Sequence, residues 1–127
     1  MNNISQISAA ALAYLGDSVL ELIIRERLIL KGIEKPGRLN DEARKFVTAV
    51  SQNVAYLKIA ELLTPEEEAV CRRARNSSHL NIPKSASPIE YKTATGFEAI
   101  FGYLHLLGDK ERIIQLFDAA YPISENT

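Results

Sequence analysis

The segment from residue 11 to residue 30 limits the possible folds most, because it places the carboxylate of Asp17 inside an apolar stretch. Its apolar residues recur at helical spacing on one face and also fill a neighbouring face: Leu12, Leu15, Val19 and Leu22 on the first, and Ala13, Leu20 and Ile24 on the second. This pattern predicts a helix buried on two sides, as in the centre of a small all-α protein. An ionised carboxylate is costly there unless it is paired or binds a ligand.

A second apolar segment, residues 95–104, supplies a partner for Asp17. It reads as another helix, with Glu98 one turn before Gly102. Glycine in a helix interior costs about 1 kcal/mol relative to alanine. Gly16 and Gly102 therefore predict that the two helices approach closely there, so that Asp17 and Glu98 meet. Two facing carboxylates suit Mg²⁺, which takes few protein ligands and keeps several waters.

Structural explanations for this acidic pair stay open. Asp17 could form an ion pair or cap a neighbouring helix while Glu98 is exposed, and such ion pairs are common. Glu21 follows Asp17 by one turn and could either join the site or pair with Arg25.

Length and composition predict one domain spanning residues 1–127. A chain of 127 residues buries enough surface to fold without a disulfide or a structural metal. Its single cysteine, Cys71, lies among apolar residues and is expected in the core. The absence of a signal peptide and of a long apolar run indicates a cytoplasmic protein. Since the net charge is -1, an anionic partner requires a local basic patch.

The rest of the chain reads as further helices, and we find no strand candidate. After Gly32, Asn40 is the expected N-cap of a long helix that breaks near Ser51. Its core stripe is predicted to contain Ala43, Phe46, Val47, Val50, Val54 and Leu57, and its other face Arg44, Lys45, Thr48 and Gln52. Thr64-Pro65-Glu66-Glu67 is a capping box that starts the next helix. A loop over 76–88, helices over 90–107 and 110–120 and a disordered tail over 122–127 complete the chain.

A basic cluster at the end of the helix that begins after Thr64 is the candidate phosphate-binding site. It is made of Arg72, Arg73 and Arg75, followed by Asn76, His79 and Lys84. Guanidinium groups and loop amides of this kind grip phosphates. The alternative is a helix end favoured by the helix dipole and a solvated loop. No cysteine or second histidine stands at zinc-ligand spacing from His79.

Three separated motifs resemble the catalytic domain of the ribonuclease III family. Residues 12–22, Leu-Ala-Tyr-Leu-Gly-Asp-Ser-Val-Leu-Glu-Leu, are similar to its signature helix. Residues 94–104, Ala-Thr-Gly-Phe-Glu-Ala-Ile-Phe-Gly-Tyr-Leu, are similar to its second acidic helix. With Arg73-Ala74-Arg75-Asn76 and Pro83-Lys84, the chain most resembles the small variant called Mini-ribonuclease III, from about residue 9 to 120.

This resemblance implies an all-α endonuclease domain that forms a homodimer with a valley for double-stranded RNA. It implies Mg²⁺ as the cofactor, and Asp17 and Glu98 as the catalytic and metal-binding residues. It also implies trimming of the precursor ends of large-subunit (23S) ribosomal RNA, with ribosomal proteins as possible accessory partners. The bound Mg²⁺ would polarise the scissile phosphate and lower the pKa of the attacking water.

The chain departs from the larger enzymes of the family at two ligand positions and at its end. Ala13 and Thr95 stand where those enzymes have acidic residues, which predicts more inner-shell water and weaker Mg²⁺ affinity. No double-stranded-RNA-binding domain is expected within 127 residues. RNA affinity would then come from the dimer, with Arg72, Arg73, Arg75, Lys84, Lys45 and Gln52 in the valley and with steep salt dependence.

Two other function classes compete with the nuclease. One is a non-catalytic helical RNA-binding module acting in ribosome assembly, and the other is a helical protein-interaction domain with no RNA role. Family domains that have lost catalysis usually lose the acidic residues, whereas this chain keeps both Asp17 and Glu98. The enzyme is therefore the preferred hypothesis.

Overall fold

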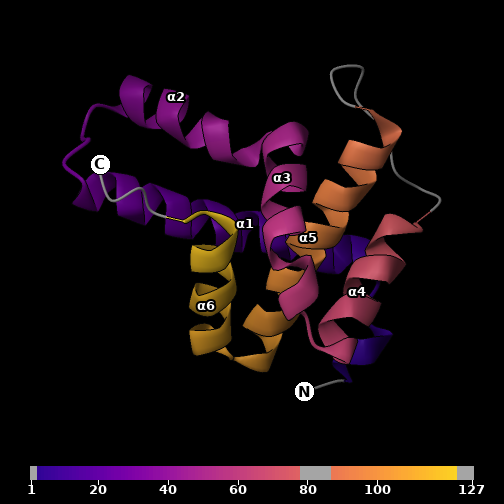
Figure 1. The fold of residues 1–127 in the computed structure, drawn as a ribbon. Helices are drawn as coiled ribbons and strands as arrows, with labels where there is room; N and C mark the ends of the chain where they lie inside the picture. The colour runs from indigo at the N-terminus through magenta and orange to yellow at the C-terminus, as the bar shows by residue number, and fades with distance from the viewer. Residues whose placement is uncertain (1–2, 78–86, 123–127) are drawn as a thin grey trace.

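Two long helices, α1 (Ala9–Leu30) and α5 (Pro88–Leu107), cross at the centre of the molecule (Figure 1). The computed structural model describes residues 3–77 and 87–122, and within these it contains helices and no strand. The other elements are α2 (Pro36–Val47), α3 (Ala49–Ile59), α4 (Pro65–Arg75) and α6 (Lys110–Ala120), with 3-10 turns at Ile4–Gln6 and Ala60–Leu62. The all-α prediction is confirmed.

Helix α5 is the element on which the others pack. Its most extensive contacts are with α1, and it also packs against α4 and α3. Figure 1 shows α4 alongside α5 and α6 beside the C-terminal end of α5, with α3 next to it. Phe97, Ile100 and Phe101 on α5 are fully buried and form the centre of the core with Leu20 of α1 and Leu116 of α6.

Helix α1 covers the predicted segment 11–30 and begins two residues earlier, at Ala9. The side chain of Ser8 accepts a hydrogen bond from the amide of Ala11 at 3.1 Å, and Gly32 adopts a positive φ of 100° just after the helix. The predicted burial on two faces is only partly correct. Leu12 and Leu20 are buried, but Leu22 is 70% exposed and Tyr14 is 84% exposed.

The long helix predicted after residue 40 is broken into two, as expected, but its start and its break lie earlier than predicted. It starts at Pro36 rather than after Asn40, because proline is favoured at the first helical position. The break falls at Thr48, whose side chain accepts from the amide of Ser51 at 3.1 Å and caps α3.

This break changes which face of α3 is buried, so the predicted core stripe is wrong there. Val50 and Val54 are each 48% exposed and Leu57 is 65% exposed. The buried residues of α3 are instead Gln52, Ala55, Tyr56 and Ile59.

Helix α4 begins with the predicted capping box. Thr64 and Glu67 bond reciprocally at 2.9 and 3.1 Å, with Pro65 at the first helical position. The carboxylate of Glu67 is also an ion-pair partner of Arg112 on α6, at 2.8 Å. This pair therefore joins the start of α4 to α6.

Helices α5 and α6 follow the predicted boundaries closely. Ser87 and Glu90 form a second capping box, which places the start of α5 at Pro88. Gly108 ends α5 with a φ of 74°, and Asp109 caps α6 by accepting from the amide of Arg112 at 3.1 Å. The predicted disordered tail lies outside the described residues apart from Pro122. No helix in the described segments combines the length and apolar character needed to cross a membrane.

Candidate active site

The crossing of α1 and α5 rests on two glycines, as the sequence predicts. A methyl group on Gly16 would lie 1.7 Å from the carbonyl oxygen of Glu98, and one on Gly102 would lie 2.0 Å from that of Leu12. Only hydrogen fits at these positions, so the two backbones are in direct contact. Asp17 and Glu98 project from this contact.

The two carboxylates line one pocket of about 200 Å³. Ala10, Ala13 and Tyr14 of α1 and Tyr91 and Thr95 of α5 complete its wall. Ala13 and Thr95 therefore face the same space as the acidic pair. The hydroxyl of Thr95 donates to the backbone carbonyl of Tyr91 at 3.0 Å.

The electrostatics of the pocket are dominated by Glu98. Burial, followed by the nearby Asp17 carboxyl, raises the pKa of Glu98 to about 8, while the Gln52 amide acts in the opposite direction. The alternative of a simply exposed Glu98 is therefore not observed. A divalent cation between the two carboxylates would favour their ionised forms.

The donors in this pocket fit a hydrated divalent cation. Asp17 and Glu98 supply hard oxygen ligands, and the small side chain of Ala13 leaves space for water beside them. Among the described residues, no group of three or more histidine, cysteine or acidic side chains is placed to hold a metal. Glu21 accepts from Arg25 at 3.0 Å, and its charge also raises the pKa of Glu98.

Gln52 is the functional candidate whose predicted role needs correction. The sequence placed it on an exposed RNA-binding face, but it is only 2% exposed and lies beside Glu98. A side chain buried there has no surface to offer to RNA. Its true face could have been found from its spacing to Ala55, Tyr56 and Ile59, which follow it at helical intervals of three, four and seven.

The basic residues at the end of α4 are partly committed to contacts within the protein. Arg72 pairs with Glu68 at 3.4 Å, and Arg73 donates to the carbonyl of Ile7 at 3.0 Å. Arg75 is half-buried, and its guanidinium donates to the hydroxyl of Tyr56 at 3.5 Å.

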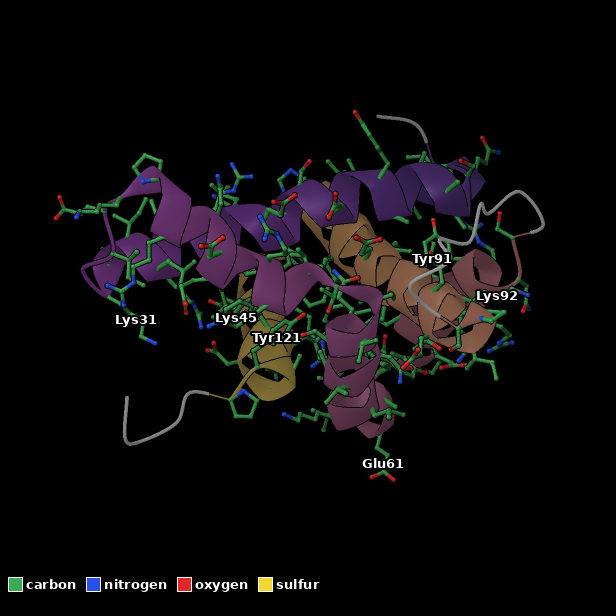
Figure 2. The ribbon with its side chains drawn as sticks, turned by 90° about the horizontal axis from the view of Figure 1, so that it is seen from above. Lys31, Lys45, Glu61, Tyr91, Lys92 and Tyr121 are labelled. Atoms are coloured by element: carbon green, nitrogen blue, oxygen red, sulfur yellow. The ribbon has the colours of Figure 1, made fainter. Side chains whose placement is uncertain are left out.

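The remaining predicted RNA contacts are scattered or outside the described residues. Asn76 is the exposed C-cap of α4. His79 and Lys84 lie outside the described residues. Lys45 pairs with Glu42 at 2.9 Å, and Figure 2 shows it toward the end of the molecule that carries Tyr121, away from Tyr91 at the acidic pocket.

A larger cavity of about 590 Å³ lies elsewhere, between the C-terminal half of α1 and α6. Its walls include Ile24, Phe46 and Phe117. Its carboxylate, Asp118, is already paired with Arg27 at 2.5 Å. Because it offers no pair of available acidic ligands, we place the chemistry in the smaller pocket.

Cys71 has the structural place that the sequence predicts. It is fully buried, and burial raises the pKa of its thiol to about 11. A methyl group on Gly96 would lie 2.7 Å from its sulfur, so α4 and α5 also approach closely there.

Comparisons with known proteins agree with this geometry. The family model described as the Ribonuclease III domain matches residues 10–109. The chain is 40% identical to Mini-ribonuclease 3 of Streptococcus pneumoniae, covering 91% of this chain and 92% of the relative. It is 42% identical to Mini-ribonuclease 3 of Symbiobacterium thermophilum, covering 86% and 84%. A crystal structure of a Fusobacterium nucleatum protein superimposes with a TM-score of 0.83 at 35% identity, over 93% of this chain and 94% of that one.

Proposed function

The chain belongs to the ribonuclease III family, as an endoribonuclease, and we propose that it cleaves double-stranded RNA with Mg²⁺ held between Asp17 and Glu98. The observation that carries this proposal is the contact at Gly16 and Gly102, which brings the two carboxylates into one pocket. Membership of an endoribonuclease family favours this hypothesis over a non-catalytic RNA-binding module.

Each residue of the pocket has a part in the proposed reaction. Asp17 and Glu98 would hold the cation through their carboxylate oxygens. When bound, Mg²⁺ neutralises the developing charge on the phosphate and makes water a better nucleophile. Ala13 and Thr95 leave room for that water, and Tyr14, which is 84% exposed, forms the outer wall.

Cleavage of a long double-stranded RNA tests this assignment. We expect wild type to cut only with Mg²⁺ and to stop in EDTA, and Asp17→Asn and Glu98→Gln to lose nearly all activity. Glu26→Gln serves as the matched control, because Glu26 is an exposed carboxylate on the same helix as Asp17. Full activity of Asp17→Asn would refute the site.

The substrate we propose is the stem formed by the precursor ends of large-subunit (23S) ribosomal RNA, in the cytoplasm. The similarity to the Mini-ribonuclease 3 proteins supports this choice. The test compares cleavage of that stem with cleavage of an unrelated duplex of equal length, with and without ribosomal proteins. A stem cut no faster than the unrelated duplex in either condition would argue against it.

The RNA-binding surface we propose uses the basic residues at the end of α4 in two copies of the chain. Arg72 is exposed beside Asn76, and His79 and Lys84 follow in the sequence. An isolated chain with net charge -1 gains affinity for a polyanion only when such local patches act together. Exposed apolar side chains on α1 and α3 support the proposed homodimer.

A further inference from the structure

Gln52 carries a polar group that the fold itself leaves without a partner. The side chain is 2% exposed, and its Nε2 atom is buried and makes no hydrogen bond. A buried N–H donor without an acceptor destabilises the folded state. A leucine or methionine at this position would avoid that cost, so packing alone does not explain the glutamine.

The neighbour of this amide is the carboxyl group of Glu98. Gln52 lies on α3, which packs against α5, and its amide acts directly on the Glu98 carboxyl. An ionised carboxylate is a much stronger acceptor than a neutral carboxylic acid, since hydrogen bonds to charged groups are about twice as strong. The carboxylate of Glu98 is therefore the acceptor that this buried donor can take.

We propose that Gln52 is a positioning residue for Glu98, whose amide N–H holds one carboxylate oxygen and leaves the other to face a divalent cation in the pocket. The inference rests on the proposed function, in which Asp17 and Glu98 hold that cation. Groups that orient metal ligands in this way contribute about 10- to 100-fold to metal affinity.

The test is direct Mn²⁺ binding in the absence of RNA, followed by the electron paramagnetic resonance signal of free Mn²⁺. Gln52→Met removes the donor and keeps the approximate length and volume of the side chain. We expect this variant to bind Mn²⁺ about tenfold more weakly. Its metal-free unfolding temperature should be equal to or above that of wild type, because a buried unsatisfied donor is gone.

A matched control is Thr93→Val, which makes the same kind of change at a buried polar residue of α5 outside the pocket wall. It should leave Mn²⁺ affinity unchanged. If Gln52→Met proves less stable than wild type, Gln52→Leu repeats the measurement with a different shape and the same missing donor. The proposal requires every folded variant without the donor to bind Mn²⁺ more weakly.

Steady-state kinetics distinguish a role of Gln52 in positioning Glu98 from a direct contact between Gln52 and RNA. A positioning role predicts that Gln52→Met lowers kcat at fixed Mg²⁺ and leaves KM for RNA unchanged. Unchanged Mn²⁺ affinity, or a raised KM with unchanged kcat, would overturn the proposal. Asp17→Asn tests the metal site independently of the role of Gln52. If this variant binds Mn²⁺ as well as wild type does, the proposed metal site itself is wrong.

Discussion

At the scale of single residues, the pocket wall combines two acidic side chains, Asp17 and Glu98, with two uncharged ones, Ala13 and Thr95. Asp17 and Glu98 are available to a cation, while Ala13 and Thr95 contribute no charge to the same wall. With so few protein ligands, most of the inner shell of Mg²⁺ must be water. Weak binding of the cation is the expected result.

The requirement for Mg²⁺ follows from this ligand set. We expect activity to saturate well above the low micromolar range of Mg²⁺. Thr95→Glu, which adds a carboxylate to the pocket wall, should lower the concentration needed. Lys92→Glu places the same group on α5 outside that wall and should not. Saturation of wild type at low micromolar Mg²⁺ would contradict this prediction.

A second acidic residue, Glu67, has a structural role that depends on pH. Burial raises the pKa of Glu67, but hydrogen bonds from Arg112 and Thr64 outweigh it and hold the pKa below its usual value of 4.5. Folding therefore favours the ionised form. Its contribution to stability is present above pH 4.5 and is lost as the pH falls below that value.

Glu67→Gln should lower the free energy of unfolding by about 1–3 kcal/mol at pH 7, because Arg112 loses its charged acceptor. The difference from wild type should shrink as the pH falls below 4.5. Urea unfolding at pH 7 and pH 4 measures both effects. Glu66→Gln, at the exposed neighbouring position, is the control. An equal loss at both pH values would show that the charge of Glu67 is not the cause.

At the scale of elements, the contact between α1 and α5 decides whether the site exists. Gly102→Ala would place a methyl group 2.0 Å from the backbone carbonyl of Leu12. Overpacking typically costs about 1–3 kcal/mol, and backbone atoms have little room to move. We expect a loss of about 3 kcal/mol in the free energy of unfolding and loss of Mg²⁺-dependent cleavage, since Asp17 and Glu98 are pushed apart.

The control for this variant is Gly37→Ala on α2. A methyl group there meets nothing within 4 Å, so we expect no loss of stability and a gain of up to about 1 kcal/mol. Thermal unfolding of both variants provides the comparison. A Gly102→Ala protein as stable as wild type would mean that the helices can separate at small cost.

At the scale of the whole molecule, the exposed apolar surface has to be accounted for. Tyr14 and Leu22 on α1 are 84% and 70% exposed, and Val54 and Leu57 on α3 are 48% and 65% exposed. Large apolar groups gathered on a surface often mark an interface. This pattern is expected if a second copy of the chain covers part of it.

We therefore expect light scattering at micromolar concentration to give twice the chain mass of 14.1 kDa. Leu22→Lys should shift the mass toward that of one chain, because a charge would have to be buried in the interface. The matched change Lys58→Leu removes an exposed charge on α3 and should not dissociate a dimer. A wild-type mass of 14.1 kDa would refute the homodimer.

Local signals in the sequence were sufficient for most helix boundaries and for the acidic pair. Ser8, the box at Thr64 and Gly108 each act on backbone groups a few residues away, so their effects do not depend on the rest of the fold. Gly16 and Gly102 predicted the helix contact because two helices without side chains at these positions can bring their backbones together. Asp17 stood out because a charge inside an apolar helix is costly wherever that helix lies.

Only the tertiary structure decided which faces of α2 and α3 are buried and what Gln52 contacts. The break falls at Thr48, three residues before the expected position near Ser51. Residues after a break are no longer in phase with the helix before it, so the stripe expected to continue to Val50 and Val54 is exposed. The valines of α3 and Gln52 are then placed by packing against α5, which lies some 40 residues further along the chain. Helical spacing can show that Gln52 shares a face with Ala55, Tyr56 and Ile59, but its contact with a residue of α5 depends on the whole fold.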